Sequence, residues 1–411
     1  MTALLDSLLA GRDDAAADAI RAAGLPGPRS EAWKYTPLRA LERRTFAPAA
    51  DIAADPSLLD GIPAPRIVFV NGRFDAGLSD ISALPAGLAI DTDAGNGEAI
   101  QIPAHPTLWQ PAGDEVFRNL NALLAVAGAR INVTGQIDAP LHLVSLSVHD
   151  GADRALYLHH RLHLHADAAL VLVEHQLGDG EHANLDNARV DIQLDAGARL
   201  SHLRVQDDNV RATRFLHSAV TLAAKADYRR LDLEIGAALS RHQLDIRLDG
   251  EAANLHCAGV LLADGKRHLD TRLGIVHGAK DTHSTLPWRG LADGRARAVF
   301  HGGITIEAGA DGSEADLQNR NLLLADSAEI DTQPVLVIHA DEVKAAHGAT
   351  VGQLDASALF YLRSRGIAEH DARRILTAAF VRDVLSMVED DALRTMLQSR
   401  LEHALARMQA A

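Results

Sequence analysis

Between about Arg130 and Val351 the chain repeats one pattern, in which short runs of alternating apolar and polar residues are broken by Asp, Gly or Asn. Turns begin at residues 167, 195, 225 and 249, so the repeat is about 27 residues long and is loosely kept. This period is typical of stacked β coils, in which each coil buries its aliphatic face only against its neighbours. We therefore predict a right-handed parallel β-helix, with an irregular β-sandwich as the structural alternative.

Helical patterns flank this core. Leucines at positions 4, 5, 8 and 9 predict N-terminal helices, residues 66–74 predict a strand ending in an Asn-Gly turn, and residues 115–127 predict a further helix. After Gln353, helices are predicted over 357–365, from Glu369 and from Asp391. The predicted organisation is an N-terminal helical region with a short strand segment (1–105), a β-helix core (106–355) and a C-terminal helical region (356–411). We expect the C-terminal helices to cap the open end of the stack and hide its strand edges.

The charge balance restricts the partners. The formal net charge of -15 and the lack of Lys/Arg runs argue against nucleic acid and against an anionic membrane surface. No apolar run is long enough to cross a bilayer and no secretion signal is recognisable at the N-terminus, so we expect a cytoplasmic protein. With the single cysteine Cys257, the chain alone can form no disulfide and cannot hold a zinc ion or an iron-sulfur cluster through cysteines.

Several side chains are candidates for chemistry, and a structural role is favoured for each. His159, His163 and His165 share one strand face at metal-ligand spacing, but no carboxylate or third histidine follows at the expected distance, so a solvated face is preferred. Cys257 alternates with His256 and is interpreted as an inert buried thiol. The loop 30–37, with the sequence SEAWKYTP, is interpreted as a packed cap rather than a ligand site. Whether the histidines near the later glycines converge is left open: His277, His283 and His301.

Enzyme motifs are missing. The chain contains no GxSxG elbow, no GxxxxGK[ST] loop and no GxGxxG after a strand. We therefore do not expect an enzyme. A β-helix enzyme, either a polysaccharide lyase or an acyltransferase, and an independent histidine-metal protein stay as alternative hypotheses.

One block near the C-terminal end carries a family resemblance. It closely resembles the C-terminal core of the SufB/SufD family of iron-sulfur cluster assembly proteins, and weaker matches lie at 70–72, 120–122 and 139–141. The matching segments are NRNLLL at 319–324, AEIDT at 328–332, ADEVK at 340–344, HGATVGQLD at 347–355 and LFYLRSRGI at 359–367.

Within the family, EAWKYT at 31–36 is similar to the SufD signature, and the cysteines typical of SufB are missing. The resemblance implies a central β-helix between helical regions. It also implies a heterodimer with SufB, docking of the ATPase SufC on the C-terminal helices, and allows a homodimer when SufB is absent.

The resemblance also assigns residues. His347 matches the histidine that faces SufB and contributes to a nascent cluster, as a candidate iron or cluster ligand; the alternative is a histidine that only ends the last coil. Many relatives have Lys-Cys-Ser-His-Gly where this chain has KAAHG at 344–348, so the local thiol is missing. No cofactor is expected to bind stably to the chain alone, and an iron-sulfur cluster is expected transiently at the SufB interface. The expected interface residues are Lys344, His347, Thr350, Gln353, Tyr361, Arg363 and Arg365.

Overall fold

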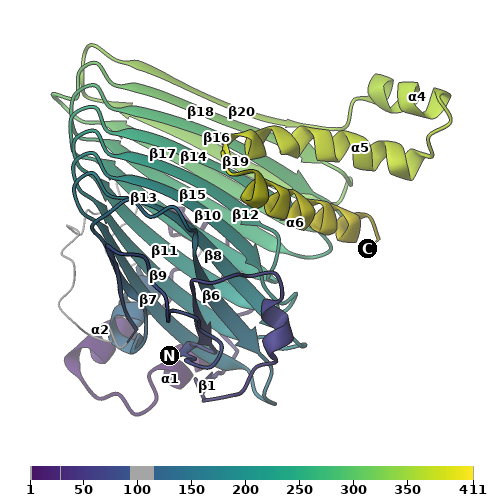
Figure 1. The fold of residues 1–411 in the computed structure, drawn as a ribbon. Coiled ribbons are helices and arrows are strands. Elements are labelled where there is room, and N and C mark those ends of the chain that lie inside the picture. The colour runs from purple at the N-terminus through teal and green to yellow at the C-terminus, as the bar shows by residue number, and fades with distance from the viewer. Residues whose placement is uncertain (1, 28, 93–114, 411) are drawn as a thin grey trace.

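Two parallel sheets stacked into a solenoid dominate the structure, a computed structural model that describes residues 2–27, 29–92 and 115–410 (Figure 1). Sheet A has the order β19 (Glu329–Ile338), β17 (Arg297–Ile306), β15 (His268–His277), β13 (Leu239–Leu248), β11 (Thr213–Leu222), β9 (Leu185–Leu194), β7 (Arg154–Leu164), β5 (Arg130–Val133) and β4 (Leu88–Asp91), and β1 (Ala47–Pro48) also pairs with β7. Sheet B has the order β20 (Lys344–Gly352), β18 (Glu314–Leu323), β16 (His283–Ala292), β14 (Asn254–Ala263), β12 (Asp227–Glu234), β10 (Arg199–Asp207), β8 (Ala169–Asp179), β6 (Leu141–Val148), β2 (Arg66–Val70) and β3 (Arg73–Phe74).

Consecutive strands alternate between the two sheets, so each coil contributes one strand to each sheet, and about seven coils are stacked. Leu185 pairs with Thr213, and Thr213 pairs with Leu239, so neighbouring coils differ slightly in length. At the C-terminal end of the stack Arg297 pairs with Glu329, so the last coil is longer than the two coils just described. The predicted β-helix and its loosely kept repeat are confirmed. The strand predicted over 66–74 is present as β2 and β3, and β2 joins sheet B by pairing with β6.

Aliphatic side chains fill the space between the sheets, as the low aromatic content of 4% predicts. The largest aromatic side chain among them is that of Trp288, which is fully buried. Its ring lies over Gly259 on the neighbouring coil, where an added Cβ would come within 2.2 Å of the ring. Gly259 is therefore required by the close approach of the indole, because any larger residue would displace it.

The interior also holds a cluster of charged side chains on strands β8 to β13. Arg204 and Arg230 are completely buried; Arg204 donates to Glu234 and to Gln176, and Arg230 donates to Asp232 with an N–O distance of 2.9 Å. Burial raises the pKa of the Glu234 carboxyl, but Arg204 and His242 more than offset this and bring it to about 2.

The direction of the Glu234 pKa shift determines how the contribution of this carboxyl to stability depends on pH. A carboxyl whose pKa is lower in the folded than in the unfolded state stabilises the fold above its unfolded pKa of about 4.3, and that stabilisation is lost as the pH falls. The Glu234 contribution is therefore complete at neutral pH and disappears between about pH 4 and about pH 2.

The N-terminal helices pack on the outer face of sheet A. Those on sheet A are α1 (Ala3–Leu8), α2 (Ala15–Ala23), η1 (Glu31–Trp33) and α3 (Val116–Leu124). The short helix η2 (Pro56–Leu59) instead packs on the outer face of sheet B, where Leu59 shares a cluster with residues of β2 and β6. Leucines and aromatic residues of α1, η1 and α3 share one cluster with Leu185 and Phe215 of the sheet. The helix predicted over 115–127 is confirmed as α3, and the prediction of helices near the N-terminus is also confirmed.

The C-terminal helices occupy a different place from the one expected. α5 (Glu369–Arg382), η3 (Asp383–Met387) and α6 (Asp391–Ala410) lie across the outer face of sheet B, and α4 (Ala356–Ser364) projects beyond it (Figure 1). Val381, Leu397 and Leu401 pack against outward-facing aliphatic residues of β8 to β16. The expectation that these helices cap the open end is wrong, because their apolar faces match this aliphatic sheet surface. Among the described residues, no helix is both long and apolar enough to cross a bilayer.

The buried ion cluster predicts a large stability effect. Replacing Arg204 by Met leaves Glu234 buried without its cation, so we expect the free energy of unfolding to fall by about 3–5 kcal/mol. The exposed pair of Arg374 with Asp371 is the matched control, and Arg374→Met should change stability by less than about 0.5 kcal/mol. Urea unfolding followed by circular dichroism measures both. Equal small effects would contradict the importance of the buried cluster.

Candidate functional site

The last coil of the solenoid ends in two strands that each lack a neighbour on one side within the described chain. β19 pairs there with β17 alone, and β20 with β18 alone. In β20 the N–H of Lys344 bonds to the carbonyl of Ser313, and N–H groups along a parallel strand alternate in direction. The N–H groups of Ala345, His347, Ala349 and Val351 therefore point to the free edge.

The edge of sheet A is less continuous than that of sheet B. Glu329 and His339 donate their N–H groups to carbonyl groups of the preceding coil, so the even-numbered residues of β19 face the free edge. One of them is Pro334, which has no N–H to offer. A proline at this place is compatible with an edge strand and interrupts its row of donors. The uninterrupted edge is that of β20.

His347 lies in the middle of β20. Its side chain faces the space between β19 and β20 at the open end of the solenoid, which we call the mouth. It is in register with Leu317, which is fully buried in the core, and side chains in register point to the same side of a parallel sheet. His347 is nevertheless exposed, because no further coil of the described chain covers it. The imidazole is thus held on a regular strand, open to solvent or to another chain.

The other predicted residues of β20 face away from His347. Lys344 and Thr350 lie on the outer face of sheet B, since they differ from His347 by an odd number of positions. The Lys344 ammonium pairs with Glu314 at 2.6 Å, and both residues line a hollow together with His283 and Asp316. The exposed Gln353 follows the strand, shortly before α4.

The remaining predicted residues belong to a separate surface. Tyr361 and Arg363 lie on α4, Arg365 caps that helix, and Figure 1 shows α4 projecting away from the sheets. Arg365 stands over the Tyr361 ring at 5.3 Å, and Arg363 pairs with Glu369 of α5. The structure therefore does not bring the seven predicted residues together, but divides them between the last coil and the projecting helix.

Three polar residues beside His347 were not singled out individually by sequence reasoning. Asn319 accepts hydrogen bonds from Thr332 of β19 at 2.8 Å and from the Asn321 amide at 2.6 Å. Asn321 also donates to the carbonyl of Thr350. This network joins β18, β19 and β20 at the mouth. The signal in the sequence was the Asn-Arg-Asn alternation at 319–321, which places two amides on the inner face of one strand.

Two buried donors lie at this network, one on Asn319 itself and one on Trp288 of the preceding coil. The Asn319 Nδ2 and the Trp288 Nε1 atoms have no hydrogen-bond partner among the described residues. The two residues are in register, and Ala349 is next in the same column, with a methyl side chain that has no acceptor atom. Burying such donors without a partner is costly for the fold.

The other candidates behave as ordinary structural residues. Cys257 is fully buried, as predicted, and burial raises the pKa of its thiol. His277 is buried between Thr282 and Ser284, and burial lowers its pKa to about 4. His301 is also buried with a pKa lowered to about 4, whereas His283 is exposed. No metal-type cluster among the described residues contains these three histidines.

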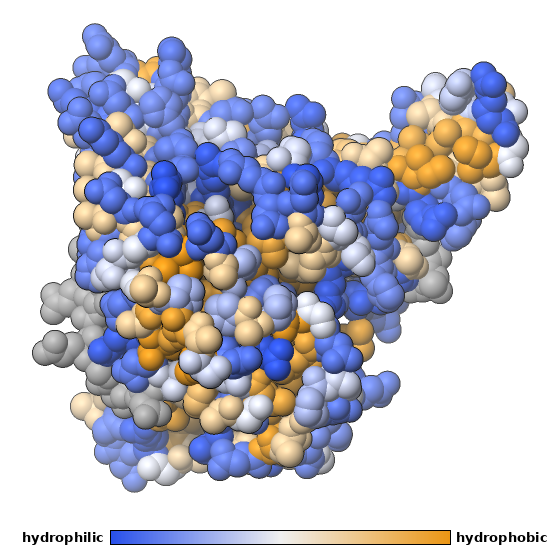
Figure 2. Space-filling view, in the orientation of Figure 1, coloured by the Kyte–Doolittle hydropathy of each residue, from blue (hydrophilic) through white to orange (hydrophobic). Residues whose placement is uncertain are grey.

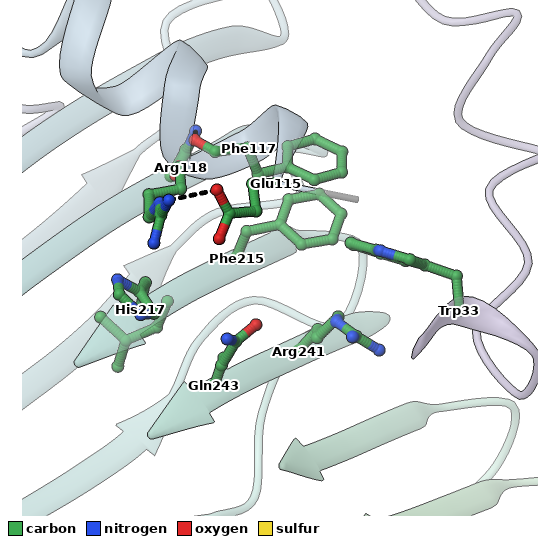
Figure 3. A pocket seen from close by; sticks show the side chains of 10 residues that line it. Trp33, Glu115, Phe117, Arg118, Phe215, His217, Arg241 and Gln243 are labelled. Carbon is green, nitrogen blue, oxygen red and sulfur yellow. Dashed lines mark hydrogen bonds and ion pairs between the residues drawn. The ribbon is translucent and has the colours of Figure 1, made fainter. Parts of the chain in front are cut away.

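The loop 30–37 is a packed cap, as predicted. Trp33 contacts Phe117 and Phe215, whose rings are stacked at 3.6 Å, and Arg241 lies over the indole at 3.9 Å (Figure 3). Thr36 donates to the buried Asp270 carboxylate. The small pocket that remains beside these rings is bordered by the Glu115–Arg118 pair, His217 and Gln243. Since His217 is already bonded to Asp245 and Glu115 to Arg118, the acid-base groups that line this pocket are engaged in pairs.

Known proteins are similar in sequence to this chain over most of its length. The family model described as "SUF system FeS cluster assembly, SufBD core domain" matches residues 147–380. The chain is similar to the iron-sulfur cluster assembly protein SufD of Escherichia coli, with 31% identity covering 93% of this chain and 90% of that protein. It is also similar to SufBD family proteins of Synechocystis sp. (30% identity, 98% and 91%) and Mycobacterium leprae (29% identity, 93% and 91%). The chain belongs to the SufBD family of iron-sulfur cluster assembly proteins.

Proposed function

We propose that this protein is a non-catalytic scaffold subunit of a SUF assembly complex, which pairs with SufB through the last coil of its solenoid. The observation that carries the proposal is the open edge of β20, with His347 facing the mouth beside it, in a chain of this family. The proposed setting is the cytoplasm.

Strand addition is the proposed mode of pairing. An exposed edge offers a row of N–H and carbonyl groups that another chain can complete, and such edges are rarely left open in a stable monomer. The β20 edge has four free N–H groups and no proline, so a strand of SufB can continue sheet B. A second copy of this chain would compete for the same edge when SufB is absent.

The proposed role of His347 follows from its place at this edge. An imidazole nitrogen is a competent iron ligand, but a cluster also needs thiolates. The single cysteine of this chain, Cys257, is buried in the core and does not reach the mouth. The thiolates would therefore come from SufB, and the cluster would form only transiently between the two chains.

The projecting helix supports the proposed docking of SufC. Phe360 and Tyr361 of α4 are 72% and 57% exposed, and Ile375 of α5 is 45% exposed. Figure 2 shows apolar side chains gathered on the part of the molecule that projects beyond the sheets. Exposed aromatic residues on a protruding element are typical of a protein-protein contact. The outer side of α4 and α5 is thus the proposed SufC site, while the inner side of α5 and α6 packs on sheet B.

His347 is tested by replacement with alanine. His347→Ala should leave folding and the complex with SufB and SufC intact, because the side chain is exposed and outside the core. It should lower the yield of cluster in anaerobic assembly, followed by absorption of the cluster. His283→Ala, an exposed histidine on the outer face of sheet B, is the control and should leave the yield unchanged. Equal yields in both variants would remove His347 from the mechanism.

The β20 edge is tested with proline. Ala349→Pro removes one N–H from the free edge without removing a bond to β18, so the fold should persist while the affinity for SufB falls by on the order of tenfold or more. Ala349→Val keeps the N–H and serves as the control. Copurification with tagged SufB and a binding titration measure the effect. Undiminished binding of the proline variant would argue against strand addition at this edge.

The SufC surface is best tested by a point variant. Truncation after Gly366 would uncover the aliphatic face of sheet B that α5 and α6 cover, and would confuse docking with aggregation. Phe360→Asp should instead abolish SufC binding and leave SufB binding unchanged. Val126→Asp, a similarly exposed apolar position near the N-terminal helices, is the control. Retained SufC binding in Phe360→Asp, measured by pull-down, would overturn the assignment.

A further inference from the structure

The histidine pair on the outer face of β7 acquires a carboxylate that the sequence spacing does not reveal. His163 lies near the end of β7, His165 directly follows this strand, and Asp195 follows β9 on the next coil. The His163 Nε2 atom lies 2.9 Å from the Asp195 Oδ2 atom, and the His165 Nδ1 atom lies 3.9 Å from the same oxygen. The three ligand atoms lie within 4.8 Å of one another.

These distances suit a shared metal ion. Ligands that hold one ion at about 2.0–2.2 Å stand roughly 2.8–3.6 Å from each other, depending on whether the geometry is octahedral or tetrahedral. The pair of His163 with Asp195 already meets this spacing, and the His165 nitrogen, at 3.9 Å from the same oxygen, would have to move closer to join them. The two imidazole rings are in contact, with their centroids 4.0 Å apart.

The carboxylate is oriented for this role. Gln193 donates to the Asp195 Oδ1 atom at 3.0 Å and leaves the Oδ2 atom toward the two imidazoles. A neighbouring group that holds the second oxygen of a ligand is the usual way in which proteins orient a carboxylate for a metal. The side chains of His163, His165 and Asp195 are 22%, 43% and 32% exposed, so an ion can enter from solvent.

A comparison with the other histidine-aspartate pairs on this sheet separates the cluster from ordinary surface pairs. Asp191, which bonds His159, is already neutralised by Arg189 at 2.9 Å. Asp245 bonds His217, and no second histidine among the described residues pairs with it. In the described part of the chain, Asp195 forms ion pairs with the two histidines and with no lysine or arginine. Its negative charge is therefore free to attract a cation.

We propose that His163, His165 and Asp195 bind one divalent first-row transition-metal ion on the outer face of sheet A. Two imidazole nitrogens and one carboxylate oxygen, with open positions toward solvent, are a ligand set for ions such as Zn²⁺, Co²⁺ and Fe²⁺. The site lies on β7 and β9, toward the opposite end of sheet A from β19. It is therefore distinct from the mouth that carries His347 and does not depend on pairing with SufB.

The experiment uses the full-length chain with any histidine tag removed. Co²⁺ is titrated and followed by its visible absorption, and Zn²⁺ binding is measured by calorimetry. The wild-type chain should bind one ion saturably. His163→Gln and His165→Gln should each weaken binding by on the order of tenfold or more, and the double variant should lose the site. His217→Gln removes a matched histidine bonded to Asp245 and should leave the affinity unchanged.

Three results would overturn the proposal. They are no saturable binding to the wild-type chain, undiminished binding to the double variant, and an equal loss in His217→Gln. Because all three positions are partly exposed, unchanged thermal unfolding of the variants will show that the fold is intact. The titration uses this chain alone, so its failure would leave the proposed pairing with SufB and SufC untouched.

Discussion

The backbone ladder between successive coils is the interaction on which the rest of the structure depends. Most N–H and carbonyl groups of the inner strands bond to the coil before or the coil after them, so a strand at the end of the stack has one edge of unpaired groups that another chain can cover. At the beginning of the stack, sheet A ends in β4, which pairs antiparallel with β5, and sheet B ends in β3, which pairs antiparallel with β2. At the other end, β19 and β20 have no such neighbour among the described strands. The same ladder that builds the fold thus creates its proposed interface.

The two faces of each sheet determine which surfaces are buried and which stay available to a partner. The inner faces form the aliphatic core and, on β8 to β13, hold buried arginines paired with carboxylates. The outer faces are covered by N-terminal helices on sheet A and by α5 and α6 on sheet B. Since these helices stabilise the sides and not the end, the final coil stays available. α4 in turn is free to project, because the inner side of α5 anchors it to the sheet.

Much of the fold could be predicted from the sequence, because alternation and turn residues are local signals. The β-helix, the flanking helices and the buried state of Cys257 and Trp33 all follow from patterns within a few residues. The placement of α5 and α6 could not be predicted, because it depends on aliphatic residues such as Leu203 and Leu231 that alternate outward on distant strands.

The carboxylate beside His163 was missed because it, too, lies on a distant part of the sequence. Asp195 belongs to the following coil, and only the register between β7 and β9 brings it near. At the mouth, the family resemblance indicated His347. The contact between Asn319 and Thr332 could not be predicted, because these residues meet only when β18 and β19 are folded into one coil.

Hydrogen exchange of the chain with and without SufB tests the proposed interface most directly. The N–H groups of Ala345, His347, Ala349 and Val351 point to the free edge and should exchange rapidly in the free chain. On addition of SufB they should become protected, while the already bonded amides of β10 and β12 stay unchanged. Protection confined to the outer faces or to the C-terminal helices, with the β20 edge still exchanging freely, would contradict the account.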